Sequence, residues 1–325
     1  MTILDTLGAH HGAFLTPTYS NLPLGRYVHV LLLRHTQSEC IFRTEGTGEP
    51  ICREVVTLDG GAASTERVVI TKRKQVAVER RTGRELLRDL GLLRKPDKGD
   101  ELCLLNSNQP CERCIDCWLY GFAAGGGGAQ RSRVMTEDAF SLLPATEVVD
   151  SRTSNATYDN GTMRHPTTGE ASQALFESEY VKPGVTFLDA QVIKDVQAAE
   201  LVYVLGNILR SSRYGATGTR IGHVQNRVLG LLFAHHEVTS NLEWTAQTTA
   251  SLMGAGVELR HPMPAAVAAE HALKVAEGMA GKAFGRVDLV TGDRLEALLG
   301  EVRAAYEDPA VWLGPLASSY DGLTG

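Results

Sequence analysis

The chain has 325 residues, of which 43% are hydrophobic and 22% charged, and its net charge is −6. This length and composition are typical of a globular protein of one or two domains. No apolar run reaches the roughly 20 residues that a membrane-spanning helix needs, and no signal peptide is visible. We therefore expect a cytoplasmic protein with no membrane partner.

Residues 25–34 read GRYVHVLLLR, a nearly continuous apolar run that predicts a central strand with both faces buried. A polar segment follows this strand, and Glu39 is its first acidic residue. The chain contains neither a Gly-x-Ser-x-Gly motif nor a His-Glu-x-x-His motif. The sequence thus presents no familiar catalytic motif.

Positive charge gathers in residues 67–95, where ten Lys or Arg residues stand against three Asp or Glu residues. The basic triplet Lys72, Arg73 and Lys74 begins a stretch that is predicted to be helical, with several leucines on one side. Because the whole chain is acidic, a phosphate-binding surface here would be local. A helix face that is merely solvated is the alternative interpretation.

Four of the six cysteines fall within LCLLNSNQPCERCIDCW, namely Cys103, Cys111, Cys114 and Cys117. The Cys-x-x-Cys spacing lets two thiolates converge on one ion, and without a secretion signal a metal is favoured over disulfides. We expect structural Zn2+, because four thiolates leave no open position for water. Three cysteines with a distant His, free thiols, an iron–sulfur cluster and a disulfide remain alternatives. Cys40 and Cys52 are expected to be ordinary buried residues.

Residues 150–187 are the most informative stretch of the chain. The first half is polar and rich in Thr and Asn, with Arg152 and Arg164, and Met163 is its only large apolar side chain. It has too little apolar surface to fold onto a core, which predicts a projecting two-stranded arm. In the second half, Lys182-Pro183-Gly184 predicts a turn into a further strand.

Residues 186–196 predict a strand and residues 198–210 an amphipathic helix, which ends in the loop SSRYGATGTR. The glycines, hydroxyl groups and arginines of this loop favour a phosphate cradle, with a plain surface turn as the alternative. Beyond it we expect strands within 221–244 and two helices within 265–306. The tail over 311–325 is expected to be loose or to lie on a neighbouring molecule.

The arm, followed by LFESEYVKPGVTF, resembles the thumb hairpin and next strand of the CRISPR-associated RAMP superfamily. The resemblance covers most of residues 25–245 and is most specific in the arm and in the segments Leu33–Gly46 and Leu205–Gly222. Within the superfamily, the chain most resembles the backbone subunit of the type I-D effector complex (Cascade).

This resemblance implies an α+β fold with a modified ferredoxin-like, or RNA-recognition (RRM-like), core. It places the palm core in 25–46 and 186–260, a fingers insertion with the cysteines in 47–130, a protruding β-hairpin thumb in 150–185, and a C-terminal helical part in 261–325. The order of a strand, a long insertion, an arm, a strand, a helix and a strand fits this expectation.

The resemblance also implies a non-catalytic subunit in antiviral defence. Several copies stack along a CRISPR guide RNA (crRNA), hold its sugar–phosphate backbone, and use the thumb to divide guide–target pairing into blocks. The implied partners are guide RNA, a target strand of DNA or RNA, further copies of the chain and other subunits of the type I-D complex. Met163 is the expected apolar wedge between bases. The expected RNA-binding residues are Arg34, Ser38, Arg43, Thr44, Lys72, Arg73, Lys74, Arg152, Asn155, Met163, Arg164, Arg213, Gly215, Thr217, Gly218 and Arg220.

Two alternatives belong to other functional classes. RNA-cleaving members of the superfamily carry an acidic residue in the loop after the first strand, where this chain has HTQS and then Glu39. A nuclease that cuts RNA or DNA with Glu39 is therefore the first alternative. A zinc-stabilised enzyme with an unknown substrate is the second.

Overall fold

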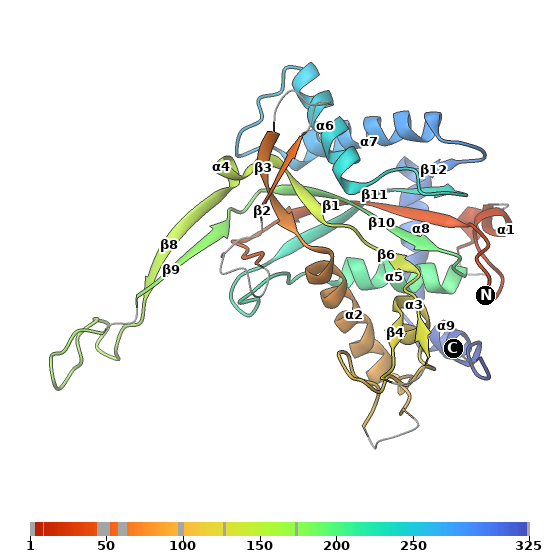
Figure 1. Ribbon diagram of the computed structural model, residues 1–325, viewed down its shortest axis with the longest axis horizontal. Coiled ribbons are helices and arrows are strands. Elements are labelled where there is room, and N and C mark those ends of the chain that lie inside the picture. Colours follow the sequence, from red (N-terminus) through yellow and green to blue (C-terminus); the bar gives the residue numbers. More distant parts are fainter. Residues whose placement is uncertain are drawn as a thin grey trace.

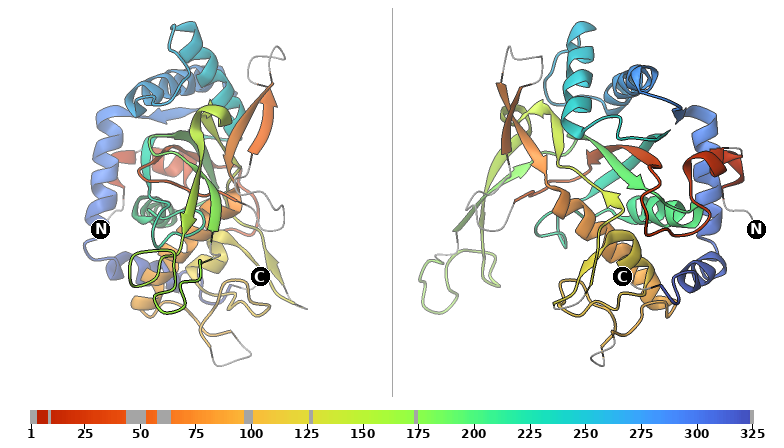
Figure 2. Two further views of the ribbon diagram at one scale, coloured as in Figure 1. Left: turned by 90° about the vertical axis from the view of Figure 1, so that its left-hand side faces the viewer. Right: turned by 45° about the vertical axis from the view of Figure 1, so that its right-hand side comes forward.

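The computed structural model describes residues 4–8, 10–43, 53–57, 64–96, 101–125, 128–172 and 175–323, and its fold is mixed α+β (Figures 1 and 2). An antiparallel sheet runs through the centre in the order β12-β11-β1-β10-β7-β3-β2, with β6 beside β10. Its strands are β1 (Tyr27–Thr36), β2 (Arg53–Thr57), β3 (Ser64–Ile70), β6 (Val134–Met135), β7 (Ala139–Pro144), β10 (Thr186–Lys194), β11 (Val224–Ala234) and β12 (Asp288–Val290).

Helices cover both faces of this sheet. In Figure 1, α6 (Asn241–Gly254) and α7 (Ala265–Lys282) lie above it, and α2 (Lys72–Asp89) and α5 (Ala198–Arg210) lie below. The remaining helices are η1 (Asp5–Leu7), α1 (His10–Phe14), α3 (Ile115–Tyr120), α4 (Ala145–Val148), α8 (Gly292–Ala305) and α9 (Ala310–Ser318). Among the described helices, none combines the length and the apolar character needed to cross a membrane.

The strand predicted from GRYVHVLLLR is β1, and it lies at the centre of the sheet between β10 and β11. Its apolar side chains alternate between two cores, since Val30 and Leu32 pack below the sheet while Leu31 and Leu33 pack above it. Because both faces are covered, the sequence shows a continuous apolar run instead of an alternating one.

The expected ferredoxin-like core has the order βαββαβ. In this chain the order is given by β1, α2, β7, β10, α5 and β11, with other elements inserted between some of them. Both of its helices lie on one face, where α2 packs against α5. The predicted helix over 198–210 is confirmed as α5, with Gln197 and Glu200 forming a capping box at its start.

The insertion predicted over 47–130 differs from the structure. Strands β2 and β3 extend the main sheet through pairing of β3 with β7, and α2 is a helix of the core. The part that stands apart from the sheet begins after α2 and contains α3 and the small hairpin of β4 (Phe122–Ala123) and β5 (Ala129–Gln130). A helical or strand period predicts an element but not the neighbour against which it packs, so the sequence did not reveal which elements of this region join the core.

The predicted arm is present as a separate two-stranded sheet of β8 (Val149–Asn155) and β9 (Leu175–Val181). It stands clear of the body in Figures 1 and 2, with its loop at the far end. Most described side chains over 151–172 are exposed. Since they have little to bury, the chain here forms a ribbon held by cross-strand hydrogen bonds.

The predicted loose tail over 311–325 is wrong for its described part. Helix α9 occupies most of it, and Trp312, Leu313, Leu316 and Tyr320 are buried in the lower core. The Gly and Ser residues between these apolar side chains concealed a helical spacing of 3–4 residues. The two predicted helices within 265–306 are confirmed as α7 and α8.

Candidate nucleic-acid interface and metal centre

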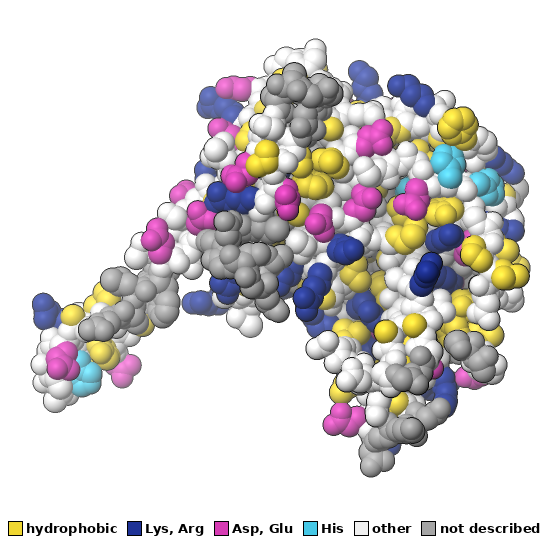
Figure 3. All heavy atoms as spheres, in the orientation of Figure 1, with side chains coloured by type: hydrophobic (Ala, Val, Ile, Leu, Met, Phe, Trp, Pro, Cys, Tyr) yellow, Lys and Arg dark blue, Asp and Glu magenta, His cyan; other side chains and the backbone are white. Residues whose placement is uncertain are grey.

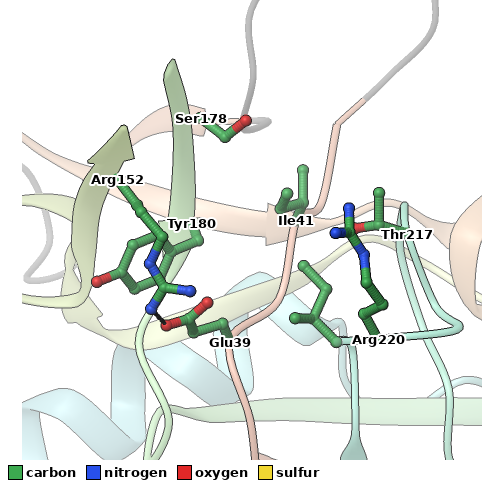
Figure 4. A pocket seen from close by; sticks show the side chains of 8 residues that line it. Glu39, Ile41, Arg152, Ser178, Tyr180, Thr217 and Arg220 are labelled. Atoms are coloured by element: carbon green, nitrogen blue, oxygen red, sulfur yellow. Dashed lines mark hydrogen bonds and ion pairs between the residues drawn. The ribbon is translucent and has the colours of Figure 1, made fainter. Parts of the chain in front are cut away.

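A pocket of about 230 Å³ opens at the base of the arm, and we call it the arm-base pocket (Figure 4). Three segments that are far apart in the sequence form its walls: the polar segment after β1, the two arm strands, and the loop between α5 and β11. Its lining residues are Glu39, Ile41, Arg152, Ser178, Tyr180, Thr217, Arg220 and Ile221. The structure thus brings together three of the predicted RNA-binding residues, Arg152, Thr217 and Arg220.

Backbone hydrogen bonds fix the loop 211–222 against the segment after β1. The amide of Ala216 donates to the carbonyl of Ile41 (2.9 Å), and the amide of Gly222 donates to the carbonyl of Glu39 (2.7 Å). Gly215 has φ +87°, and a Cβ there would lie 2.5 Å from the Ile41 carbonyl oxygen. The predicted glycine is therefore needed for close approach of two backbones. Gly218, by contrast, has no such neighbour.

Arg152 and Arg220 reach the pocket from different sides, as Figure 4 shows. Arg152 forms an ion pair with Glu39, and its guanidinium lies over the ring of Tyr180, 5.3 Å from the ring centroid. Arg220 is exposed and, among the described residues, has no ion-pair partner. A free guanidinium beside the hydroxyl of Thr217 is suited to bind a phosphate.

Arg34 was predicted to bind RNA, and the structure contradicts this prediction. Its side chain is fully buried, with Nη2 at 2.8 Å from a Glu79 oxygen and 2.7 Å from an Asp189 oxygen. It also donates to the hydroxyl of Tyr214 (3.2 Å) and to Asn226 (2.8 Å). Burial raises the pKa of Glu79, and the charge of Arg34 opposes that rise. Arg34 is therefore a core residue. It supports the loop 211–222 through its hydrogen bond to Tyr214, which directly precedes Gly215 in the sequence.

The other predicted contacts lie at several places on the surface. Arg43 and Arg213 are exposed near the arm-base pocket, and Thr44 lies outside the described residues. Ser38 is half-buried and accepts a hydrogen bond from the amide of His223 (2.9 Å), so its hydroxyl has a structural role.

The basic triplet lies at the start of α2, where Lys72 and Arg73 are exposed and Lys74 is half-buried. Figure 3 shows Lys and Arg side chains gathered over this part of the face, beside the hollow under the arm. The predicted helix is α2, but its buried side is partly polar, since it includes Gln75, Glu79 and Arg84. The leucine spacing alone did not reveal this.

At the far end of the arm, Asn155, Met163 and Arg164 lie on or next to the loop. The amide nitrogen of Asn155 is 2.8 Å from the sulfur of Met163, which is half-buried. Arg164 donates to the carbonyl of Gly169 (3.0 Å). These contacts order the loop and leave the guanidinium of Arg164 exposed.

Sequence reasoning missed Tyr180 and Ser178 in the pocket, and gave Glu39 only a catalytic alternative. Tyr180 and Ser178 lie on the same face of the arm as Arg152, because Arg152 pairs with Ser178 across the ribbon. The alternation of side chains along a strand could have placed them, once the pairing register was known.

The four predicted metal-binding cysteines converge in the structure. Their sulfur atoms all lie within 4.8 Å of one another and are buried, so this cluster could hold a metal ion. The Sγ atom of Cys117 is 3.7 Å from that of Cys103 and 3.9 Å from that of Cys111. A tetrahedron with Zn–S bonds of about 2.3 Å has S–S separations of about 3.8 Å. The thiols therefore fit a tetrahedral ion.

Hydrogen bonds from backbone amides favour the thiolate forms of Cys103 and Cys111. The amide of Cys111 points to the sulfur of Cys103 (3.4 Å), and the amide of Cys114 points to the sulfur of Cys111 (3.3 Å). Arg84 is buried beside Cys103 and forms an ion pair with Asp116 (2.7 Å). The neighbouring thiols lower the pKa of Cys103 and raise those of Cys114 and Cys117. Cys40 is buried elsewhere, and burial raises its pKa to about 12, while Cys52 lies outside the described residues.

The chain matches the family model described as "Csc2 Crispr" over residues 14–312. No curated protein matches it. The crystal structure of Thermofilum pendens Csc2 is similar, with a TM-score of 0.61 and 20% identity over 98% of this chain and 99% of that one. A chain of a structure titled "CRISPR RNA-guided surveillance complex, pre-nicking" has a TM-score of 0.52 and 12% identity over 80% of this chain and 89% of that one.

At these identities the structural matches show the fold alone, and the family model carries the assignment. Since that model spans more than half of the sequence, the chain belongs to the Csc2 CRISPR family.

Proposed function

We propose that the chain binds guide RNA as a backbone subunit of a type I-D CRISPR interference complex and holds the RNA without cutting it. Membership of the Csc2 family supports this role. The observation that carries it is the arm-base pocket, where Arg152 of the arm strand β8 and Arg220 of the loop between α5 and β11 line one cavity at the base of a projecting polar ribbon. A polyanionic strand could lie under the arm with its phosphates on these arginines.

Several copies of the chain stack along the guide in this proposal, together with other subunits of the complex and a paired target strand. The arm of each copy crosses the strand and separates short blocks of guide–target pairs. Met163, half-buried near the end of the arm, is the proposed apolar wedge. Lys72 and Arg73 at the start of α2 extend the basic surface beside the hollow under the arm.

The proposed ion at Cys103, Cys111, Cys114 and Cys117 is structural Zn2+. Four buried sulfur atoms leave no position for a substrate or a water molecule. When bound, the ion would tie α3 to the segment around Cys103. Arg84, held by Asp116, places positive charge beside the thiolates and offsets part of their charge.

The nuclease alternative would use Glu39. Among the described residues that line the arm-base pocket, Glu39 is the only carboxylate, and it is already paired with Arg152. A pair of carboxylates that could hold two catalytic metal ions is thus missing from that lining. Incubation of purified protein with labelled RNA or DNA and Mg2+ tests this point. Cleavage that disappears in Glu39→Ala would establish the alternative.

Native purification tests the main proposal. The protein should be isolated with its partners, and the bound nucleic acid should be extracted and sequenced. Recovery of CRISPR guide RNA is expected. Recovery of protein that retains no RNA, even at low ionic strength, would contradict the proposal.

A further inference from the structure

The arm-base pocket contains a carboxylate that phosphate binding alone does not explain. Glu39 follows β1, and its side chain is 20% exposed. Figure 4 shows it at the floor of the pocket, with Arg152 on one side and Arg220 on the other. A negative charge at this position repels every phosphate group, whether the strand is RNA or DNA.

The carboxylate of Glu39 has a free hydrogen-bonding oxygen. Arg152 contacts Oε1, and within the described part of the chain Oε2 accepts no hydrogen bond. The amide of Gly222 holds the backbone of Glu39 against the loop 211–222 (2.7 Å), and the ion pair with Arg152 orients its carboxylate. A ligand that donates a hydrogen bond at this point would therefore meet an acceptor that is already in place.

The shape of the pocket suits one sugar–phosphate unit. Its volume of about 230 Å³ is below the range of drug-sized ligand sites. Ile41 and Ile221 give it apolar walls against which a sugar ring can pack, and Arg220 offers donors to an adjacent phosphate. In such a unit only the ribose of RNA carries a 2′-hydroxyl that can donate to a carboxylate.

We propose that Glu39 is a specificity-determining residue, which makes the arm-base pocket prefer RNA over DNA by accepting a hydrogen bond from a ribose 2′-hydroxyl. The proposal rests on the proposed function and explains how the same pocket distinguishes RNA from DNA. Repulsion by Glu39 weakens the binding of both strands, and the hydroxyl of RNA offsets that cost. DNA has no donor at this position, so nothing offsets the repulsion that the ion pair with Arg152 leaves uncompensated.

The experiment compares three single-stranded oligonucleotides of one sequence and length: RNA, DNA, and RNA with 2′-fluoro groups. The 2′-fluoro strand keeps the sugar conformation of RNA but lacks the hydroxyl donor. Affinities are measured at one fixed salt concentration for the full-length wild type and for Glu39→Ala. Glu270→Ala is the matched control, since it removes the same charge from an exposed position of α7, far from the arm in Figure 1.

The wild type is expected to bind RNA about tenfold more tightly than the 2′-fluoro strand, as one hydrogen bond to a charged acceptor allows. Glu39→Ala should lose this preference, chiefly because it binds DNA and the 2′-fluoro strand more tightly. Glu270→Ala should keep it. If the wild type binds RNA but Glu39→Ala has the same RNA preference, the role of Glu39 is refuted while the proposed function stands. If the wild type binds no RNA at low salt, both fail.

Discussion

Arg34 and Arg220 show how differently two arginines of one predicted interface can be used. Arg34 is fully buried between Glu79 and Asp189, whereas Arg220 is exposed at the arm-base pocket. Removing the buried Arg34 would leave the carboxylates of Glu79 and Asp189 without the positive charge that compensates them, which costs stability. Removing an exposed arginine mainly weakens ligand binding and changes the stability of the fold little. The two residues are therefore expected to respond to substitution in opposite ways.

Arg220→Ala should weaken RNA binding roughly tenfold, because one charge-assisted contact to phosphate is lost. It should also reduce the slope of log affinity against log salt concentration by about 1. Fluorescence anisotropy with labelled RNA over a salt series measures both quantities. Arg303→Ala, at an exposed position of α8, is the control and should change neither. An unchanged slope in Arg220→Ala would remove this residue from the list of phosphate contacts.

His29 gives the fold a dependence on pH. The buried ring accepts a hydrogen bond from the amide of Val238 at Nε2 (3.0 Å), so Nδ1 carries the proton and donates to Leu232 (3.2 Å). Burial, as the main cause, lowers the pKa of His29 from 6.5 to about 4. Between these two values the unfolded chain binds a proton that the folded chain does not, so stability falls as the pH falls.

The free energy of unfolding should therefore decrease by about 3 kcal/mol at most from this group between pH 6.5 and pH 4. Urea titrations at several pH values measure the change. His29→Gln should show a flatter pH dependence, while His223→Gln, at an exposed position, should follow the wild type. Parallel curves for wild type and His29→Gln would exclude His29 as the source.

At the level of elements, the cysteine segment has almost no sheet or long helix to hold it. It contains α3, of six residues, and the two-residue strands β4 and β5. Short elements such as these gain little from hydrogen bonds of their own. A bound ion would supply the missing constraint, because binding free energy adds to folding free energy.

Removal of the metal should therefore destabilise the protein by several kcal/mol without unfolding the main sheet. Purified protein should contain one Zn2+ per chain by elemental analysis, and a strong chelator should lower its Tm. Cys114→Ser should abolish the bound zinc, whereas Cys40→Ala, at a buried cysteine outside the cluster, should retain it. A metal-free protein with an unchanged Tm after chelation would contradict a structural role.

The arm is an element that contributes little to the core. Apart from the bridge between Val181 and Cys40 at its base, the described residues of its strands pair with each other, and the described side chains beyond the base are mostly exposed. Replacing the loop between Asn155 and Leu175 with a two-residue Asn-Gly turn should keep the fold and leave Tm within a few degrees of the wild type. Binding of single-stranded guide should persist, since the arm-base pocket is intact.

The same shortened variant should lose the division of guide–target pairing. Chemical probing of a guide–target duplex bound to the wild-type assembly should reveal reactive, unpaired nucleotides at regular intervals, and the shortened variant should protect them. A wild-type pattern in the shortened variant would show that the arm does not separate the pairs.

At the scale of the whole molecule, the negative net charge and the local basic surface act together. The chain carries −6 overall, yet Lys72, Arg73, Arg152 and Arg220 are available on the side of the arm. Acidic surfaces elsewhere should keep free copies apart, and a polyanionic strand should bring them together. We therefore expect assembly to depend on RNA.

Native mass spectrometry with RNA of increasing length should show that the number of bound chains rises in steps with length, and DNA of the same lengths should give fewer chains. Without RNA, the protein should be monomeric at low micromolar concentration. An assembly of fixed size that is independent of RNA length would contradict stacking along the strand.

Features that arise from local pattern could be predicted without the structure. The run in β1 predicted a strand covered on both faces, the polar composition of 150–172 predicted a projecting arm, and the spacing of the four cysteines predicted their convergence. Each of these features can be predicted from the sequence, because the apolar period, the polar composition or the cysteine spacing is itself the physical cause of the structure.

Which charged residues are buried and which stay exposed depends on contacts between distant segments. Arg34 is buried because Glu79 and Asp189 reach it from α2 and β10, and Arg152 meets Glu39 because the base of the arm is bridged to the segment after β1 through Val181 and Cys40. The positions of α2, β3 and α9 in the fold also depend on distant contacts, since α2 and α9 pack against α5 and β3 pairs with β7. Such contacts join residues that are distant in the sequence, and the energy of a buried charge depends on the partner that it finds there.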